Sequence, residues 1–135
     1  MITIPRERDE TGAVSLVTVA IIVPATMMVI LTIVQVALLA HARSVATSAA
    51  QQGADVAQRF DGTTSAAEAE TYRYLDAMGS RMLTSRDVTV TRGPDQASVT
   101  VTGQVFSLVP GIHPRVSVTS AGPLEQFRPP VDQAH

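Results

Sequence analysis

The chain has 135 residues, no cysteine and a formal net charge of −2 at neutral pH. This length allows one small domain at most beside any membrane segment. The missing cysteines exclude disulfides, thiolate metal ligands and cysteine nucleophiles. A charge so close to zero gives no indication of the strongly basic surface that nucleic acid binding requires, so we expect no nucleic acid partner.

Residues 1–12 form a short polar head in which Arg6 to Glu10 carries five consecutive charges. The head has no apolar periodicity, so we expect it to be unstructured or removed. Arg6 and Arg8 lie before the long apolar segment that follows, and Arg43 is the nearest cation after it. The positive-inside tendency therefore predicts a cytoplasmic N-terminus and an extracytoplasmic C-terminal part.

The apolar segment is the strongest signal in the chain. No Asp, Glu, Lys or Arg occurs between Glu10 and Arg43. A helix over residues 14–40 would reach roughly 40 Å, against a hydrocarbon core of about 30 Å. The segment is longer than the ~7–15 apolar residues of a secretory signal. A buried helix in a soluble bundle would need apolar partner helices, which the chain lacks. We therefore predict a single membrane span over residues 13–40, with membrane lipid as its surroundings.

Two polar or helix-breaking residues lie inside this span. Pro24 removes one backbone hydrogen bond and predicts a kink. Gln35 is the most polar side chain of the span and has two interpretations. It either lies near the outer interface, where its amide finds a polar partner, or it bonds to another helix, a contact worth ~0.6–2 kcal/mol in membranes.

The helical pattern continues beyond the membrane span. Apolar residues recur there at spacings of three and four, and most of them are small: Val45, Ala49, Gly53, Val56 and Phe60. Such a narrow stripe packs closely against another helix or a sheet. Asp61-Gly62 is the expected stop signal. The pattern thus predicts one helix from about Val14 to Phe60, whose outer half is a stalk in water.

A second helix is predicted from Ala66 to about Leu83, because Ser65-Ala66-Ala67-Glu68 has the form of a capping box. Val/Thr alternation then predicts three short antiparallel strands, around residues 88–91, 99–105 and 116–119. A three-stranded meander needs helices to cover its apolar face. The fold class is therefore α+β, with a small extracytoplasmic domain over residues 41–122 and a Pro-rich tail over residues 123–135.

One connection between the predicted strands is unusually apolar. It holds four large apolar residues: Phe106, Leu108, Val109 and Ile112. Phe106 and Leu108 either turn inward and close the sheet, or the tip protrudes and contacts a partner or the membrane surface.

The chain offers little catalytic chemistry. His41, His113 and His135 are dispersed, without carboxylates at ligand spacing. Nucleophile elbows, phosphate loops and zinc-helix motifs do not occur in the sequence. We therefore predict a protein that is not an enzyme and uses no metal or cofactor.

Several segments together resemble a known family. The chain is similar to the TadE/TadG-like minor pseudopilins of tight-adherence (Flp) pilus systems. The matching features are the leader-like residues 10–15, the helix proline Pro24, the stalk residues 42–46 and 53–57, and the end segments 116–123 and 125–128. Taken together, these pieces cover nearly the whole chain, and their order along the chain supports the resemblance. The fold that the resemblance implies is pilin-like.

The resemblance implies a membrane-inserted structural or assembly component of a pilus or a related type II/IV secretion apparatus. It implies cleavage between Gly12 and Ala13 by a prepilin peptidase, and partners among other pilin-like subunits and pilus platform proteins. The family Glu about five residues after the cut is missing, because Val17 and Thr18 occupy that region. This divergence favours an accessory subunit over a main fibre subunit. The alternative is a membrane-tethered extracellular binding module without a pilus role.

Overall fold

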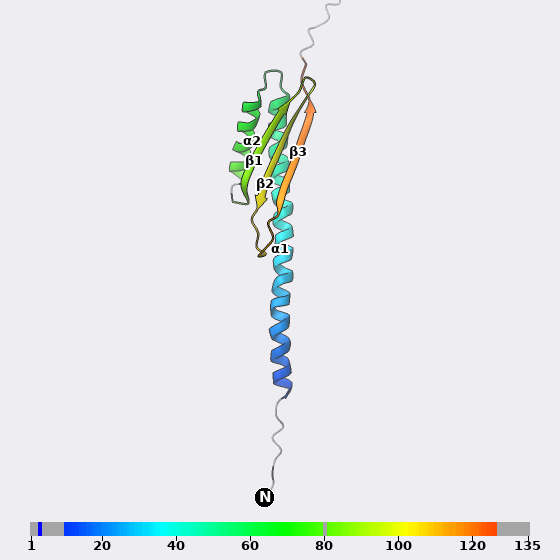
Figure 1. The fold of residues 1–135 in the computed structure, drawn as a ribbon, viewed down its shortest axis with the longest axis vertical. Helices are drawn as coiled ribbons and strands as arrows, with labels where there is room; N and C mark the ends of the chain where they lie inside the picture. Colours follow the sequence, from blue (N-terminus) through cyan, green and yellow to red (C-terminus); the bar gives the residue numbers. More distant parts are fainter. Residues whose placement is uncertain (1–2, 4–9, 80, 127–135) are drawn as a thin grey trace, which may run out of the picture. The chain divides into compact units, whose positions relative to one another are not determined.

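A computed structural model of the chain describes residue 3, residues 10–79 and residues 81–126. The elements follow in the order α1 (Glu10–Gln58), α2 (Thr64–Met78), β1 (Leu83–Arg92), β2 (Gln96–Val105) and β3 (Arg115–Pro123). This confirms the predicted α+β class, with a long apolar helix, a second helix and a three-stranded antiparallel sheet (Figure 1). Most of the predicted head and the tail from residue 127 lie outside the described residues.

The chain divides into two compact units, residues 1–34 and residues 35–135. In the first unit, α1 continues through Pro24 as assigned helix, so the kink stays a prediction. Two threonine hydroxyls donate back to the fourth preceding carbonyl: Thr26 to Ile22 at 2.8 Å and Thr32 to Met28 at 2.7 Å. These bonds leave few polar atoms on an otherwise apolar helix surface, as lipid surroundings require.

The end of α1 differs from the prediction, because the helix stops at Gln58 and Phe60 lies beyond it. Gly62 closes the end, and its N–H donates to the Arg59 carbonyl at 2.9 Å. A Cβ at Gly62 would overlap the Val56 carbonyl oxygen. Only glycine fits this position, as is common just after a helix.

A side chain from the sheet completes the same helix end. The guanidinium of Arg92, the last residue of β1, donates to the carbonyls of Gly62, Arg59 at 3.2 Å and Phe60 at 3.5 Å. These carbonyls follow the last turn of α1, where a cation also interacts favourably with the helix dipole. Arg92 therefore ties the sheet to α1.

We expect Arg92→Ala to lower the free energy of unfolding by about 1–2 kcal/mol, because it leaves helix-end carbonyls without a charged donor. Urea unfolding of the full chain in detergent, followed by circular dichroism, measures this loss. Arg81→Ala removes the same charge at an exposed position and is the matched control. Equal stability of the two variants would contradict the capping role.

The limits of α2 correct the sequence prediction at both ends. Its N-cap is Thr63, whose hydroxyl accepts from the Ala66 N–H at 3.1 Å, so the cap lies two residues before the predicted Ser65. The helix ends at Met78 because Gly79 closes it, with its N–H donating to the Leu75 carbonyl at 2.7 Å. Leu83, predicted to end this helix, instead begins β1.

In the sheet, β2 pairs antiparallel with both β1 and β3. Val101 lies opposite Val88 on one side and Val118 on the other. Burial alternates strictly along β2, so one face carries buried Val and Ala residues while the other carries Ser, Thr and Gln. This is the pattern of a sheet with one covered and one solvated face. β3 extends to Pro123, one residue into the predicted tail.

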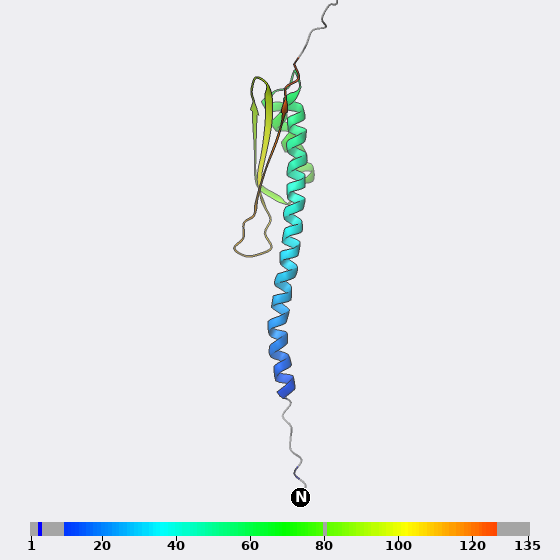
Figure 2. The same cartoon turned by 90° about the vertical axis from the view of Figure 1, so that its right-hand side faces the viewer.

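Alanine dominates the part of α1 that covers the sheet. Six buried alanines, each exposed by no more than 1%, lie on α1: Ala42, Ala46, Ala49, Ala50, Ala54 and Ala57. They pack with valines of the sheet and with Ala67 and Leu75 of α2 in one hydrophobic core. Figures 1 and 2 show the sheet and α2 alongside this part of α1. Such small side chains allow close approach of the layers.

Candidate assembly and membrane surfaces

The residues of the predicted small-residue stripe differ in their exposure. Val45, Ala49 and Gly53 are buried, and Val56 is half-buried. Phe60 is 67% exposed beyond the end of α1, because the helical spacing that would align it with the others stops at Gln58. The buried part of the stripe therefore packs within the chain, and a helix of another subunit has no access to it.

At Gly53, α1 lies in close contact with both α2 and β2. A Cβ there would overlap the Thr71 hydroxyl oxygen on α2 and lie 3.3 Å from both the Ala67 carbonyl oxygen and Val99 Cγ1 on β2. Thr71 is fully buried, and its hydroxyl donates to the Ala67 carbonyl at 2.7 Å. The contact therefore requires a glycine on α1.

The exposed apolar surface lies on the earlier part of α1. Large apolar side chains there are 41–73% exposed: Leu16, Val17, Val19, Ile21, Ile22, Val23, Met27, Met28, Val29, Ile30, Ile33, Val34 and Val36. Among the described residues, α1 is the one helix long and apolar enough to cross a membrane. It therefore supplies a candidate membrane anchor.

Gln35 joins this helix to the apolar loop between β2 and β3. Its side chain is 8% exposed. Its amide nitrogen donates to the Phe106 carbonyl at 3.2 Å, and its amide oxygen accepts from the Leu108 N–H at 2.7 Å. Both ends of the amide are thus used by loop backbone. The amide therefore has polar partners, as the first interpretation of Gln35 expected, and these partners are loop backbone groups of the same chain.

The four apolar loop residues take two different environments. Phe106 and Ile112 are 57% and 50% exposed, whereas Leu108 and Val109 are half-buried. Phe106 therefore does not turn inward to close the sheet. Gly111 near the tip has a φ of +82°, a conformation that glycine adopts without strain.

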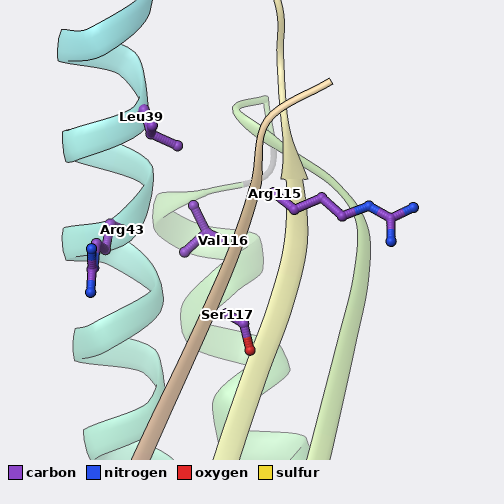
Figure 3. Close-up of a pocket in the computed structure, with 5 residues that line it drawn as sticks. All are labelled: Leu39, Arg43, Arg115, Val116 and Ser117. Atoms are coloured by element: carbon purple, nitrogen blue, oxygen red, sulfur yellow. The ribbon is translucent and has the colours of Figure 1, made fainter. Parts of the chain in front are cut away.

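A shallow hollow of about 200 Å³ lies between α1 and β3 and is lined by five residues: Leu39, Arg43, Arg115, Val116 and Ser117. Figure 3 shows Leu39 and Val116 facing the space between helix and strand, while the Arg115 side chain extends away from α1. The polar groups do not converge on a common point. The hollow thus lacks the arrangement of polar groups that fixes a small ligand.

The remaining charged contacts are structural. Arg86 Nη1 lies 2.7 Å from Asp76 Oδ1, an ion pair between β1 and α2 without the alignment of a hydrogen bond. Within the residues that the structure describes, no group of three His, Asp or Glu side chains could hold a metal ion. Of the predicted cleavage pair, Gly12 is exposed in the first turns of α1, and cleavage stays a prediction.

Comparison with known proteins relates part of the chain to a family model. Residues 13–55 match the family model described as "TadE-like protein". The match covers the apolar part of α1 and most of the alanine-rich part, and it confirms the resemblance predicted from the sequence for this segment. Neither the curated proteins nor the solved structures contain a match to the chain.

Proposed function

We propose that this chain, which is TadE-like over residues 13–55, is a membrane-anchored structural or assembly subunit of a tight-adherence pilus or a related secretion apparatus. The observation that carries the proposal is the position of the TadE-like match in the chain. It covers most of α1, which is, among the described residues, the helix long and apolar enough to cross a membrane and which the sheet covers in its later part.

The expected topology follows from the charges that flank the apolar segment. Arg6 and Arg8 precede it, and Arg43 follows it. The proposal places the N-terminus in the cytoplasm and the unit from residue 35 onward outside. Protease added to intact cells should then remove that unit, and carbonate washing should leave the protein in the membrane.

The proposed subunit acts by helix packing in the membrane. The alanine face of α1 is already covered by the sheet and α2, so other pilin-like subunits would contact the exposed apolar side chains between Leu16 and Val34. Affinity isolation of the tagged chain from membranes tests this. It should recover pilin-like subunits and pilus platform proteins, and recovery of none would favour the tethered binding module instead.

The proposal includes cleavage after Gly12 by a prepilin peptidase. We expect the mature chain to begin at Ala13, and we expect Gly12→Val to abolish processing because a branched side chain replaces the residue before the cut. Intact-mass spectrometry of the membrane-bound protein distinguishes the two forms. Ala13→Ser keeps Gly12 and is the control. A wild-type chain that begins at Met1 would remove processing from the proposal without affecting the membrane anchor.

A further inference from the structure

We infer that the loop of residues 106–114 is a second membrane contact, which places the side chains of Phe106 and Ile112 in the interfacial layer of the bilayer that holds α1. This inference rests on the membrane placement of α1 in the proposed function. It adds a lipid-binding surface to the unit that starts at Gln35.

The hydrogen bonds from Gln35 determine which part of α1 the loop lies beside. About 20 residues cross the hydrocarbon core. Within the predicted span of residues 13–40, the uncharged residues from Ser15 to Val34 are enough to do so, which leaves residues 35–40 for the headgroup layer. Gln35 follows directly, and Arg43, the first charged residue after the span, lies roughly 12 Å further along the helix. The loop that Gln35 binds is therefore level with the boundary between hydrocarbon and headgroups.

Several backbone groups of the loop have hydrogen-bond partners within the protein and so need no water. Besides the two bonds to Gln35, the N–H of Phe106 donates to the Met82 carbonyl at 3.1 Å, and the Ser107 hydroxyl donates to the Val109 carbonyl at 2.8 Å. Pro110 and Pro114 have no N–H to satisfy. Irregular backbone at membrane depth is tolerated when protein groups complete its hydrogen bonds.

The side chains fit a lipid interface as well. No Asp, Glu, Lys or Arg occurs between Asp95 and Arg115, so the loop brings no charge into the bilayer. Arg115 follows the loop directly, and Arg43 lines the same hollow (Figure 3). Both cations then lie at the level of lipid phosphates, which attract them.

The exposed area favours lipid over a second copy of the chain. Phe106 and Ile112 are about half exposed and together offer on the order of 200 Å². A stable protein interface buries about 800 Å² on each partner. Insertion into a bilayer needs no such minimum, because each buried apolar group contributes separately.

The chain has no tryptophan, so single-tryptophan variants report on one site each. The experiment uses the full chain in vesicles of phosphatidylcholine and phosphatidylglycerol, with or without phosphatidylcholine brominated on its acyl chains. We expect the emission of Phe106→Trp and Ile112→Trp to fall by about twofold or more with brominated lipid, as contact with acyl chains requires. Phe60→Trp, at a phenylalanine 67% exposed beyond the far end of α1, is the matched control and should not be quenched.

Leu16→Trp, 73% exposed within the span, separates the two proposals. Quenching of Leu16→Trp without quenching at 106 and 112 would overturn the loop inference and leave the membrane anchor intact. No quenching at any of these sites would overturn both. Blue-shifted loop emission that resists bromine and declines as the protein is diluted in lipid would mean that a second copy covers the loop, which also overturns the inference. If Phe106→Trp loses its fold by circular dichroism, Ile112→Trp decides.

Discussion

Gly53→Ala should lower the free energy of unfolding by about 1–3 kcal/mol, although the same substitution at an open helix position stabilises. The new methyl group would overlap the Thr71 hydroxyl, and it would press on the Ala67 carbonyl and on Val99 at 3.3 Å. Thr71 cannot move aside cheaply, because it is fully buried and its hydroxyl donates to Ala67. Thermal unfolding in detergent should show a midpoint lower by several degrees.

Gly12→Ala is the matched control within the same helix, measured beside Gly53→Ala in the unprocessed chain, which is produced without a prepilin peptidase and keeps Gly12. Nothing lies within 4 Å of a Cβ at Gly12, so only the helix propensity changes, and alanine should gain about 0.5–1 kcal/mol locally. A loss of stability at Gly12 equal to that at Gly53 would show that the close contact is not the cause.

Removing the overlapped atom tests the mechanism directly. Thr71→Ala alone should destabilise, because it deletes a buried hydroxyl and its hydrogen bond. In the double variant Gly53→Ala/Thr71→Ala, the new methyl group takes up part of the vacated space. The two changes should therefore cost less together than their sum, by about 0.5–3 kcal/mol. Strict additivity would contradict the overlap at Thr71.

The regular elements could be predicted because their patterns are local. The uncharged run and the threefold and fourfold spacing of small residues predicted α1, and the Val/Thr alternation predicted all three strands. The ends were less accurate, since competing signals lie close together. Thr63 and Ser65 are both good N-cap residues, and the structure uses Thr63.

The roles of Arg92 and Phe60 could not be predicted from local sequence patterns. The Arg92 side chain donates to carbonyls 30 to 33 positions earlier in the chain, so nothing near Arg92 in the sequence marks it as a helix cap. Phe60 fitted the spacing of the stripe, but the helix ends before reaching it. Sequence spacing predicts a helix face only as far as the helix continues.

Gln35→Leu should release the loop between β2 and β3. Leucine keeps an apolar side chain of similar size but leaves the Leu108 N–H and the Phe106 carbonyl without their partner. Losing two such partners should cost about 2–4 kcal/mol of local stability. Hydrogen exchange of the Leu108 amide in vesicles should then accelerate by about 30-fold or more. Gln52→Leu, the same change at an exposed position of α1, should leave that amide unaffected.

The same variant separates the loop contact from the helix–helix alternative for Gln35. If the amide serves the loop, Gln35→Leu changes Leu108 exchange first, and any loss of partner subunits follows from a misplaced loop. If the amide instead bonds to a neighbouring helix, partner recovery from membranes falls while Leu108 exchange stays at the wild-type rate. The geometry favours the first result, because both ends of the Gln35 amide already have partners in the loop and the side chain is 8% exposed. A polar residue in an apolar helix is stable when its partners come with the same chain, and here they lie 71 and 73 positions away.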